Sequence, residues 1–205
     1  MTLLDVRNLV RTGLAPVSFS LAAGECLAVC GPSGAGKSLL LRAIADLDPN
    51  DGLVLLDGAD RAGIAAPEWR RLVGYLPAEP GWWADRVGDH FPDWQAALPW
   101  LSRLNLPADV CDWPLTRPST GERMRLAFVR ALVNQPKVLM LDEPTAALDG
   151  ASVRLVEDII AEQRADGLAV LWVSHDPAQA RRVARRCLVV ESGSVREEEW
   201  TPISL

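Results

Sequence analysis

The chain has 205 residues, of which 49% are hydrophobic and 23% charged, and its formal net charge at pH 7 is −6. This length allows one substantial hydrophobic core, and the composition excludes a collagen-like or an intrinsically disordered chain. The acidic balance disfavours broad binding of nucleic-acid backbones, because Lys and Arg supply most of that affinity. We therefore expect no nucleic acid among the partners.

The longest apolar runs, such as residues 138–141 and 168–173, are far shorter than the roughly 20 residues that cross a bilayer. Any membrane span is therefore expected on another chain. The first residues lack a basic segment followed by an apolar one, so we expect no secretory signal and a cytoplasmic location. Because no histidine lies near the four cysteines, we interpret them as small buried residues rather than metal ligands or disulfide partners: Cys26, Cys30, Cys111 and Cys187.

Apolar runs and helical stretches alternate along most of the chain. Residues 3–10, 17–21 and 53–57 show the short alternating patterns of an antiparallel sheet, whereas residues 26–30, 138–142, 168–173 and 187–191 read as buried strands. This order predicts an α/β fold with a mostly parallel sheet core covered by helices and an antiparallel β subdomain. Residues 1–205 are expected to form a single domain.

Residues 80–118 differ in character, because prolines and tryptophans interrupt the α/β alternation there. We interpret this stretch as a small helical subdomain inserted within the domain. Five tryptophans lie in it, at positions 82, 83, 94, 100 and 113. They form either a docking groove for a partner helix or the packing of the subdomain itself, and composition leaves both readings open.

A glycine-rich segment lies between the strand predicted at residues 26–30 and a helical run at residues 38–46. It fits the pattern G-x-x-x-x-G-K-[ST], in which backbone N–H groups and the start of the following helix bind phosphate oxygens. The lysine is expected on the β- and γ-phosphates of ATP, and the serine after it on Mg²⁺. The residues assigned to this site are Gly31, Pro32, Ser33, Gly34, Ala35, Gly36, Lys37 and Ser38.

An acidic pair follows the strand predicted at residues 138–142. Asp142 ends the strand and is expected to hold Mg²⁺, next to the phosphate-binding segment. Glu143 is expected to polarise a water molecule for in-line attack on the γ-phosphate, because phosphoryl transfer depends on positioning and charge stabilisation. The phosphate loop and the acidic pair alone are compatible with kinases, GTPases and recombination ATPases.

Three further motifs narrow this choice. Residues 119–123 (STGER) resemble the signature of the ATP-binding cassette (ABC) family, residues 144–149 (PTAALD) resemble its D-loop, and His175 resembles its switch histidine. With the phosphate loop and the acidic pair, they occur in the family's order. The chain therefore resembles the ATP-binding subunit of an ABC transporter, and in particular the compact bacterial cassettes associated with iron export.

This resemblance implies a P-loop NTPase fold, ATP and Mg²⁺ as cofactors, and ATP hydrolysis that drives transport, with Glu143 and His175 as catalytic residues. It implies a head-to-tail homodimer in which each signature and D-loop faces the nucleotide of the other copy. The residues implied there are Ser119, Thr120, Gly121, Glu122 and Asp149. The implied partner is a separate integral membrane permease, which places the cassette at the inner face of the membrane.

Three features of the sequence complicate this reading. Ser119 and Glu122 also form a capping-box pattern, which needs no ligand. Ala78 stands where the family carries the Q-loop glutamine, and Glu79 beside it is a candidate substitute. Residues 1–18 contain no aromatic side chain to stack on adenine, and Arg11 is the alternative through its guanidinium plane.

Two other functional classes were weighed. A soluble ABC ATPase that acts on nucleic acid or the ribosome shares these motifs, but the sequence shows neither a long coiled coil nor a second cassette. A small-molecule P-loop kinase leaves residues 119–123 and 147–149 unexplained. The transport ATPase is therefore the leading hypothesis.

Overall fold

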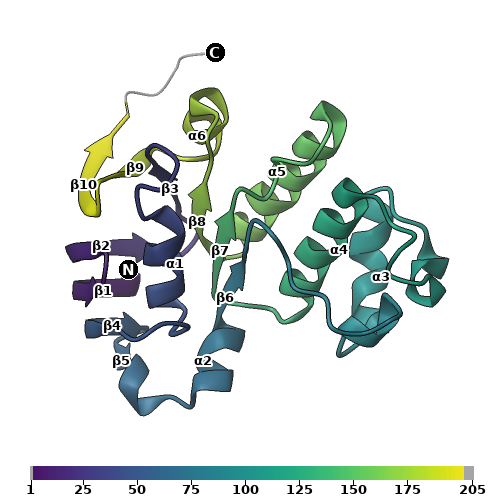
Figure 1. Ribbon diagram of the computed structural model, residues 1–205, viewed down its shortest axis with the longest axis horizontal. Helices are drawn as coiled ribbons and strands as arrows, with labels where there is room; N and C mark the ends of the chain where they lie inside the picture. The colour runs from purple at the N-terminus through teal and green to yellow at the C-terminus, as the bar shows by residue number, and fades with distance from the viewer. Residues whose placement is uncertain (1, 201–205) are drawn as a thin grey trace.

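The computed structural model describes residues 2–200, so the domain predicted over 1–205 extends slightly beyond the described residues at both ends. Two sheets face each other, and the helix Lys37–Ile44 lies between them (Figure 1). The smaller sheet has the order β2-β1-β4-β5 and is antiparallel throughout. Its strands are β1 (Thr2–Arg11), β2 (Leu14–Ala22), β4 (Asp51–Leu56) and β5 (Ala59–Asp60).

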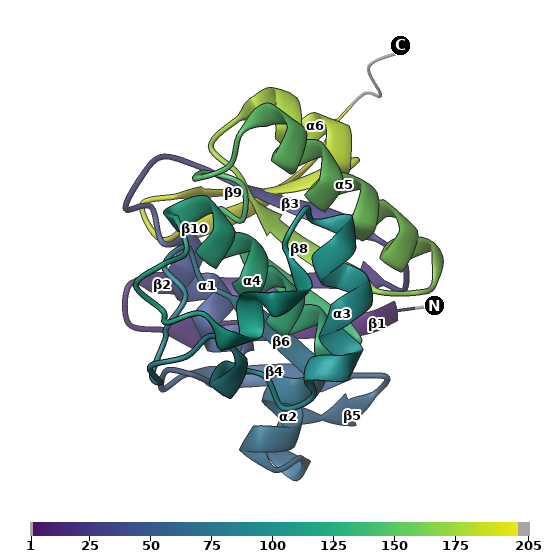
Figure 2. The ribbon, with the colours of Figure 1, turned by 90° about the vertical axis from the view of Figure 1, so that its right-hand side faces the viewer.

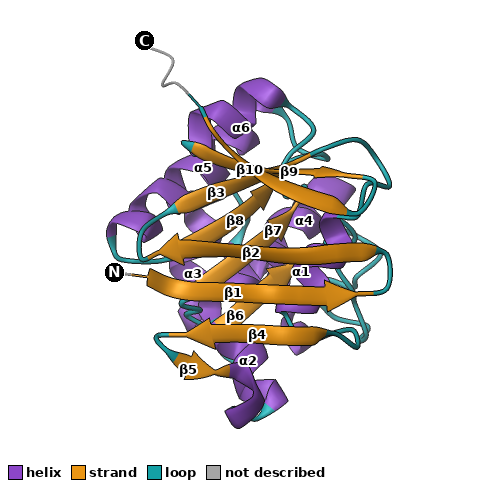
Figure 3. Cartoon of the chain, turned by 90° about the vertical axis from the view of Figure 1, so that its left-hand side faces the viewer, coloured by secondary structure: helices purple, strands orange, loops and turns teal. Residues whose placement is uncertain are grey.

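The larger sheet has the order β10-β9-β3-β8-β7-β6 and is parallel except for β10, which runs antiparallel to β9. Figure 3 shows the antiparallel sheet in front of this one, with the helices α3 to α6 behind. The predicted fold class is therefore confirmed. The strands are β3 (Cys26–Cys30), β6 (Val73–Leu76), β7 (Val138–Asp142), β8 (Ala169–Val173), β9 (Arg186–Glu191) and β10 (Ser194–Glu199).

The predicted strands are right to within a few residues, and the differences have local causes. Leu168, expected in a strand, instead donates its N–H to Gln163 O and closes the preceding helix. Asp57 likewise lies beyond β4, at a φ of 50° in a turn. Strands β5, β6 and β10 were not predicted, because β5 and β6 are short and β10 carries four charged residues on an exposed edge.

Six α-helices are found within residues 2–200, together with short 3-10 segments at Arg61–Gly63, Gly88–His90 and Ala108–Asp112. One hydrophobic core lies between the two sheets and includes residues of α1 and α2, and a second lies on the other face of the larger sheet under α3 to α6. No helix of the described part is long and apolar enough to cross a membrane. The helices are α1 (Lys37–Ile44), α2 (Ala66–Leu72), α3 (Trp94–Arg103), α4 (Thr120–Val133), α5 (Gly150–Ala165) and α6 (Pro177–Val183).

The stretch 80–118 contains α3 and two of the 3-10 segments, and α3 packs on α4 (Figure 1). Four of its five tryptophans lie half-buried against the second core, which accounts for them as packing residues. Trp83 differs, because 71% of its surface is exposed.

The prediction that all four cysteines are buried is right for Cys26 and Cys187 and wrong for the other two. Cys30 ends β3 where the sheet opens toward the phosphate loop, and Cys111 lies in a 3-10 segment at the surface. All four are free thiols, as expected.

Candidate active site

The predicted site residues gather where the parallel strands of the larger sheet end. The phosphate loop follows β3, Ala78 follows β6, Glu143 follows β7, and His175 follows β8. Because β3, β8, β7 and β6 are neighbours and parallel, these segments leave the sheet at the same edge. Ligands of open α/β sheets bind at this edge, outside the carboxyl ends of the strands.

The phosphate loop has a backbone shape that glycine makes possible. Gly31, Gly34 and Gly36 have φ angles of 141°, 75° and 112°. A Cβ atom on Gly31 would lie 2.1 Å from the carbonyl oxygen of Val190, so a larger residue cannot stand there. Gly36 caps α1 without any side-chain bond to the first turn, which also lacks acidic residues. The first N–H groups of α1 are therefore free of side-chain partners and suit a phosphate.

Lys37 lies inside the loop. Its side chain is 6% exposed, and Nζ donates hydrogen bonds to the carbonyl oxygens of Gly31 and Pro32, at 2.8 Å and 2.9 Å. Ser38, next in the chain, is exposed. An ammonium group within the loop and a hydroxyl at its mouth fit the polyphosphate and the metal that the pattern predicts.

Asp142 and Glu143 differ sharply in their surroundings. Asp142 is 3% exposed, and its Oδ2 accepts a hydrogen bond of 3.0 Å from the hydroxyl of Tyr75. Burial and the nearby Asp142 carboxylate raise the pKa of Tyr75, so the phenol stays a proton donor. This contact could not be predicted from the sequence, because 67 positions separate the two residues. The Asp142 carboxylate is thus held in a fixed orientation by Tyr75.

Glu143 contacts His175 directly. Oε1 of Glu143 and Nε2 of His175 lie 2.6 Å apart, with exposed side-chain fractions of 28% and 46%. Glu143 has a φ of 52°, which is rare for a residue other than glycine and is held only by its surroundings. A cavity of about 250 Å³ borders both side chains. The arrangement offers a carboxylate that can accept a proton from water, with an imidazole beside it.

The signature-like segment and the D-loop-like segment contact each other. Ser119 caps α4: its backbone N–H donates to the Glu122 carboxylate at 2.8 Å, and its Oγ accepts from the Glu122 N–H at 3.3 Å. These bonds lower the pKa of Glu122. A Cβ on Gly121 would lie 3.1 Å from the carbonyl oxygen of Ala147. Thr120, at the start of α4, is exposed.

Asp149 caps α5 in the same way, accepting hydrogen bonds from the N–H groups of Ala151 and Ser152 at 3.0 Å and 2.9 Å. The bonds from Ser152 lower its pKa most. Within one chain, Asp149 is therefore a helix cap.

Figure 1 shows α4 in a separate lobe from α1, so one chain does not bring its signature-like segment to its own phosphate loop.

Two positions depart from the family pattern: the Q-loop position at Ala78, and the adenine-stacking position, for which Arg11 is the candidate. Ala78 and Glu79 are exposed after β6, and Glu79 makes no hydrogen bond or ion pair within residues 2–200. Arg11 is held by Asp48 at 2.7 Å with 16% of its side chain exposed. Asp48 also accepts two hydrogen bonds from Arg42, which lower its pKa. The guanidinium of Arg11 is therefore engaged in an ion pair, and its stacking on adenine stays a prediction.

The comparison with known families agrees with this geometry. The ABC transporter family matches residues 14–146, which cover the phosphate loop, the signature-like segment and the acidic pair. The chain belongs to the ABC transporter family. It carries the ATP-binding, ATPase domain of that family.

Relatives of this ABC domain occur in plants and bacteria. Protein STAR1 of Oryza sativa subsp. japonica is 37% identical over 193 residues, covering 88% of this chain and 56% of its own length. The probable iron export ATP-binding protein FetA of Escherichia coli (strain K12) is 37% identical over 172 residues, covering 78% of this chain and 76% of FetA. The chain therefore spans little more than half of STAR1. The predicted resemblance to iron-export cassettes is confirmed.

A solved structure supports the same assignment. The structure of the ATP binding subunit of an ABC transporter superposes with a TM-score of 0.86 and 25% identity, covering 97% of this chain and 90% of the other. Both sheets and the helical lobe thus follow the ABC fold.

Proposed function

We propose that this ABC cassette hydrolyses MgATP as a head-to-tail homodimer and thereby drives transport through a separate membrane permease. The 2.6 Å contact between Glu143 and His175, at the strand edge that also carries the phosphate loop, supports this proposal most directly. The direct test is phosphate release from MgATP by the purified chain, measured together with its oligomeric state. A chain that binds MgATP and releases no phosphate would contradict it.

In the proposed mechanism, the N–H groups of the loop and Lys37 hold the phosphate chain, and Ser38 and Asp142 hold Mg²⁺. Bound Mg²⁺ would supply charge stabilisation to the transferred phosphoryl group. Tyr75 keeps the Asp142 carboxylate oriented. Glu143 accepts the proton of the attacking water, and His175 fixes the Glu143 carboxylate and binds developing negative charge.

The placement of the motifs supports the proposed dimer. In one chain, Ser119 and Asp149 cap helices that lie away from the phosphate loop (Figure 1). In the proposed dimer, the segment 119–122 of one copy supplies N–H groups of a helix start to the phosphates bound by the other. Each nucleotide then needs residues from both copies.

We further propose that residues 80–118 carry the contact with the permease, at the inner face of the membrane. Trp83 is the most exposed large hydrophobic side chain of the described residues and lies beside Trp82. Both tryptophans pack edge-on against the buried His90, and the Arg130 guanidinium lies 4.7 Å and 4.8 Å from their ring centres. A rigid, exposed indole is typical of an interface anchor.

Replacing Trp83 by alanine should therefore weaken membrane binding roughly tenfold without changing the ATPase rate of the isolated chain. Binding is measured by sedimentation with vesicles from the source organism and with protein-free vesicles of the same lipids. Leu47→Ala, which removes the other exposed large hydrophobic side chain, is the matched control. Equal binding of Trp83→Ala and the wild type, or equal binding to both vesicle types, would contradict this contact.

The Q-loop-like segment gives a separate prediction. With Ala78 in place of a glutamine, the isolated chain should bind MgATP but turn it over slowly, because one polar group for water and metal is missing. Ala78→Gln should then raise kcat more than it changes KM, since orienting the water matters most in the transition state.

The rival explanation is that exposed Glu79 has taken over this contact. In that case Glu79→Ala would sharply lower the rate and Ala78→Gln would add little. Steady-state ATPase rates of both variants, with and without the membrane fraction, separate the two accounts. No change in either variant would mean that this loop does not serve the reaction.

A further inference from the structure

A buried glutamine connects the two loops that carry Glu143 and His175, which follow β7 and β8. Gln179 lies on α6 and is 4% exposed, so its amide must find partners inside the protein. Its Oε1 accepts hydrogen bonds from Ser174 Oγ at 2.8 Å and from Thr145 Oγ1 at 3.1 Å. Ser174 directly precedes His175, and Thr145 lies just after Glu143. The side-chain oxygen of Gln179 therefore links the loop after β7 to the loop after β8.

The other end of the amide is anchored just as firmly. Nε2 of Gln179 donates to Oε1 of Glu157 on α5 at 2.8 Å, and Glu157 accepts two hydrogen bonds of 2.7 Å from Arg182. Burial of Glu157 disfavours its charge, but the bonds from Arg182 and Gln179 outweigh this, and the pKa of Glu157 is lowered. Helices α5 and α6 lie side by side in Figures 1 and 2. The amide is thus attached to an ionised, fixed carboxylate.

We infer that Gln179 is a positioning residue for hydrolysis, which keeps the Glu143 and His175 side chains in contact by tying Thr145 and Ser174 to one amide. The inference rests on the proposed ATPase function. The strained backbone of Glu143 persists only where its surroundings hold it, and the bond to Thr145 is part of that support. The amide of Gln179 serves both needs, because its oxygen accepts from two hydroxyls and its NH2 group donates to a carboxylate.

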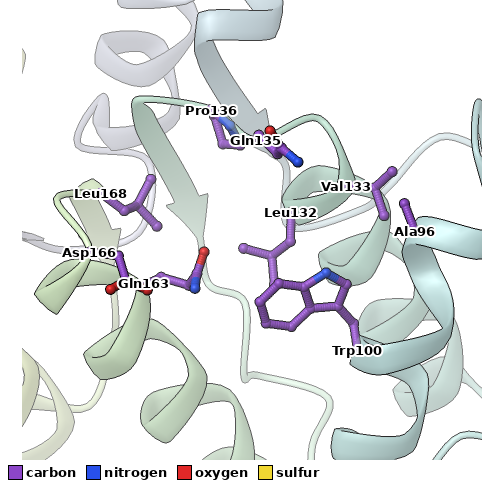
Figure 4. A pocket seen from close by; sticks show the side chains of 9 residues that line it. All are labelled: Ala96, Trp100, Leu132, Val133, Gln135, Pro136, Gln163, Asp166 and Leu168. Atoms are coloured by element: carbon purple, nitrogen blue, oxygen red, sulfur yellow. The ribbon is translucent and has the colours of Figure 1, made fainter.

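The first test replaces Gln179 by methionine, which keeps the length and removes the hydrogen bonds. kcat should fall about tenfold while KM for MgATP stays within about twofold, because misplaced catalytic groups affect the transition state most. The matched control is Gln163→Met, on α5. Gln163 lines a pocket of about 280 Å³ with Trp100 and Leu132 (Figure 4), and this pocket shares no lining residue with the cavity beside Glu143 and His175.

A second readout does not depend on activity. The chain has two histidines, and the other one, His90, is buried and forms its hydrogen bonds with residues 83–87, outside this network. The ring C–H signals of His175 in NMR spectra should shift in Gln179→Met and stay unchanged in Gln163→Met. A wild type without ATPase activity would contradict the proposed function, whereas unchanged His175 signals in Gln179→Met would overturn the positioning role.

A charge swap keeps the test valid if Gln179→Met folds poorly. Gln179→Glu preserves the shape but sets a carboxylate against Glu157, and kcat should fall about tenfold. Adding Glu157→Gln restores one amide and one carboxylate in reversed order, so the double variant should recover to within about threefold of the wild type. A double variant no faster than Gln179→Glu alone would overturn the inference, provided that the wild type hydrolyses ATP.

Discussion

Replacing Glu143 by glutamine should reduce ATP hydrolysis by at least about 100-fold and leave MgATP affinity nearly unchanged. Glutamine keeps the size of the side chain and can still accept a hydrogen bond from His175, but it cannot take up a proton. Because ATP is then bound and not consumed, the homodimer should persist. Phosphate release measures the first effect, calorimetric titration the second, and gel filtration with MgATP the third.

Glu162→Gln provides the matched control, because Glu162 lies on α5 and pairs with Arg103 at the surface, at 2.7 Å. This variant should keep the wild-type rate, since exposed ion pairs contribute little. A Glu143→Gln variant that retained wild-type turnover would remove Glu143 from the reaction and leave His175 without its assigned partner.

Replacing Lys37 by alanine should weaken MgATP binding by roughly 10- to 100-fold, the range expected when a hydrogen bond to a charged group is lost. Hydrolysis and dimer formation should fail with it at ordinary ATP concentrations. Calorimetric titration gives the affinity directly. Lys37→Ala is expected to weaken the binding of MgATP itself. Glu143→Gln is expected to keep this binding and lose turnover, so the two variants can be told apart.

Lys137 is the chain's other lysine, exposed and paired with Asp57, and Lys137→Ala is the control for general loss of positive charge. A thermal unfolding curve shows whether Lys37→Ala still folds, since Lys37 also bonds the carbonyl oxygens of Gly31 and Pro32. Unchanged MgATP affinity in a folded Lys37→Ala variant would contradict the phosphate-loop assignment.

The sequence was sufficient for the parts of the site that follow local rules. The phosphate loop combines glycine spacing with a strand before it and a helix after it, and all three can be recognised in one continuous stretch of the sequence. The capping box of α4 and the acidic pair at the end of β7 are equally local, and the structure has both at the expected positions. The parallel core followed from buried apolar runs, because such strands are covered on both faces.

Contacts between distant segments could not be predicted in this way. Tyr75 meets Asp142 only because β6 pairs with β7, and β6 itself was too short to recognise. Gln179 meets Glu157 only because α5 and α6 pack together. The ion pair of Arg11 was likewise not predictable, because its partner Asp48 lies 37 positions away.

The arginine on α4 that packs on the two tryptophans gives this helix a mechanical property. Arg130 also donates to the carbonyl oxygen of Gly81 at 3.0 Å, while the first turn of the same helix contacts Ala147 through Gly121. The two attachments, nine residues apart, are separated by about 13.5 Å along one unbroken helix, at about 1.5 Å per residue. Such a helix bends little over this length. A tilt imposed at the tryptophans would therefore displace the opposite end of α4.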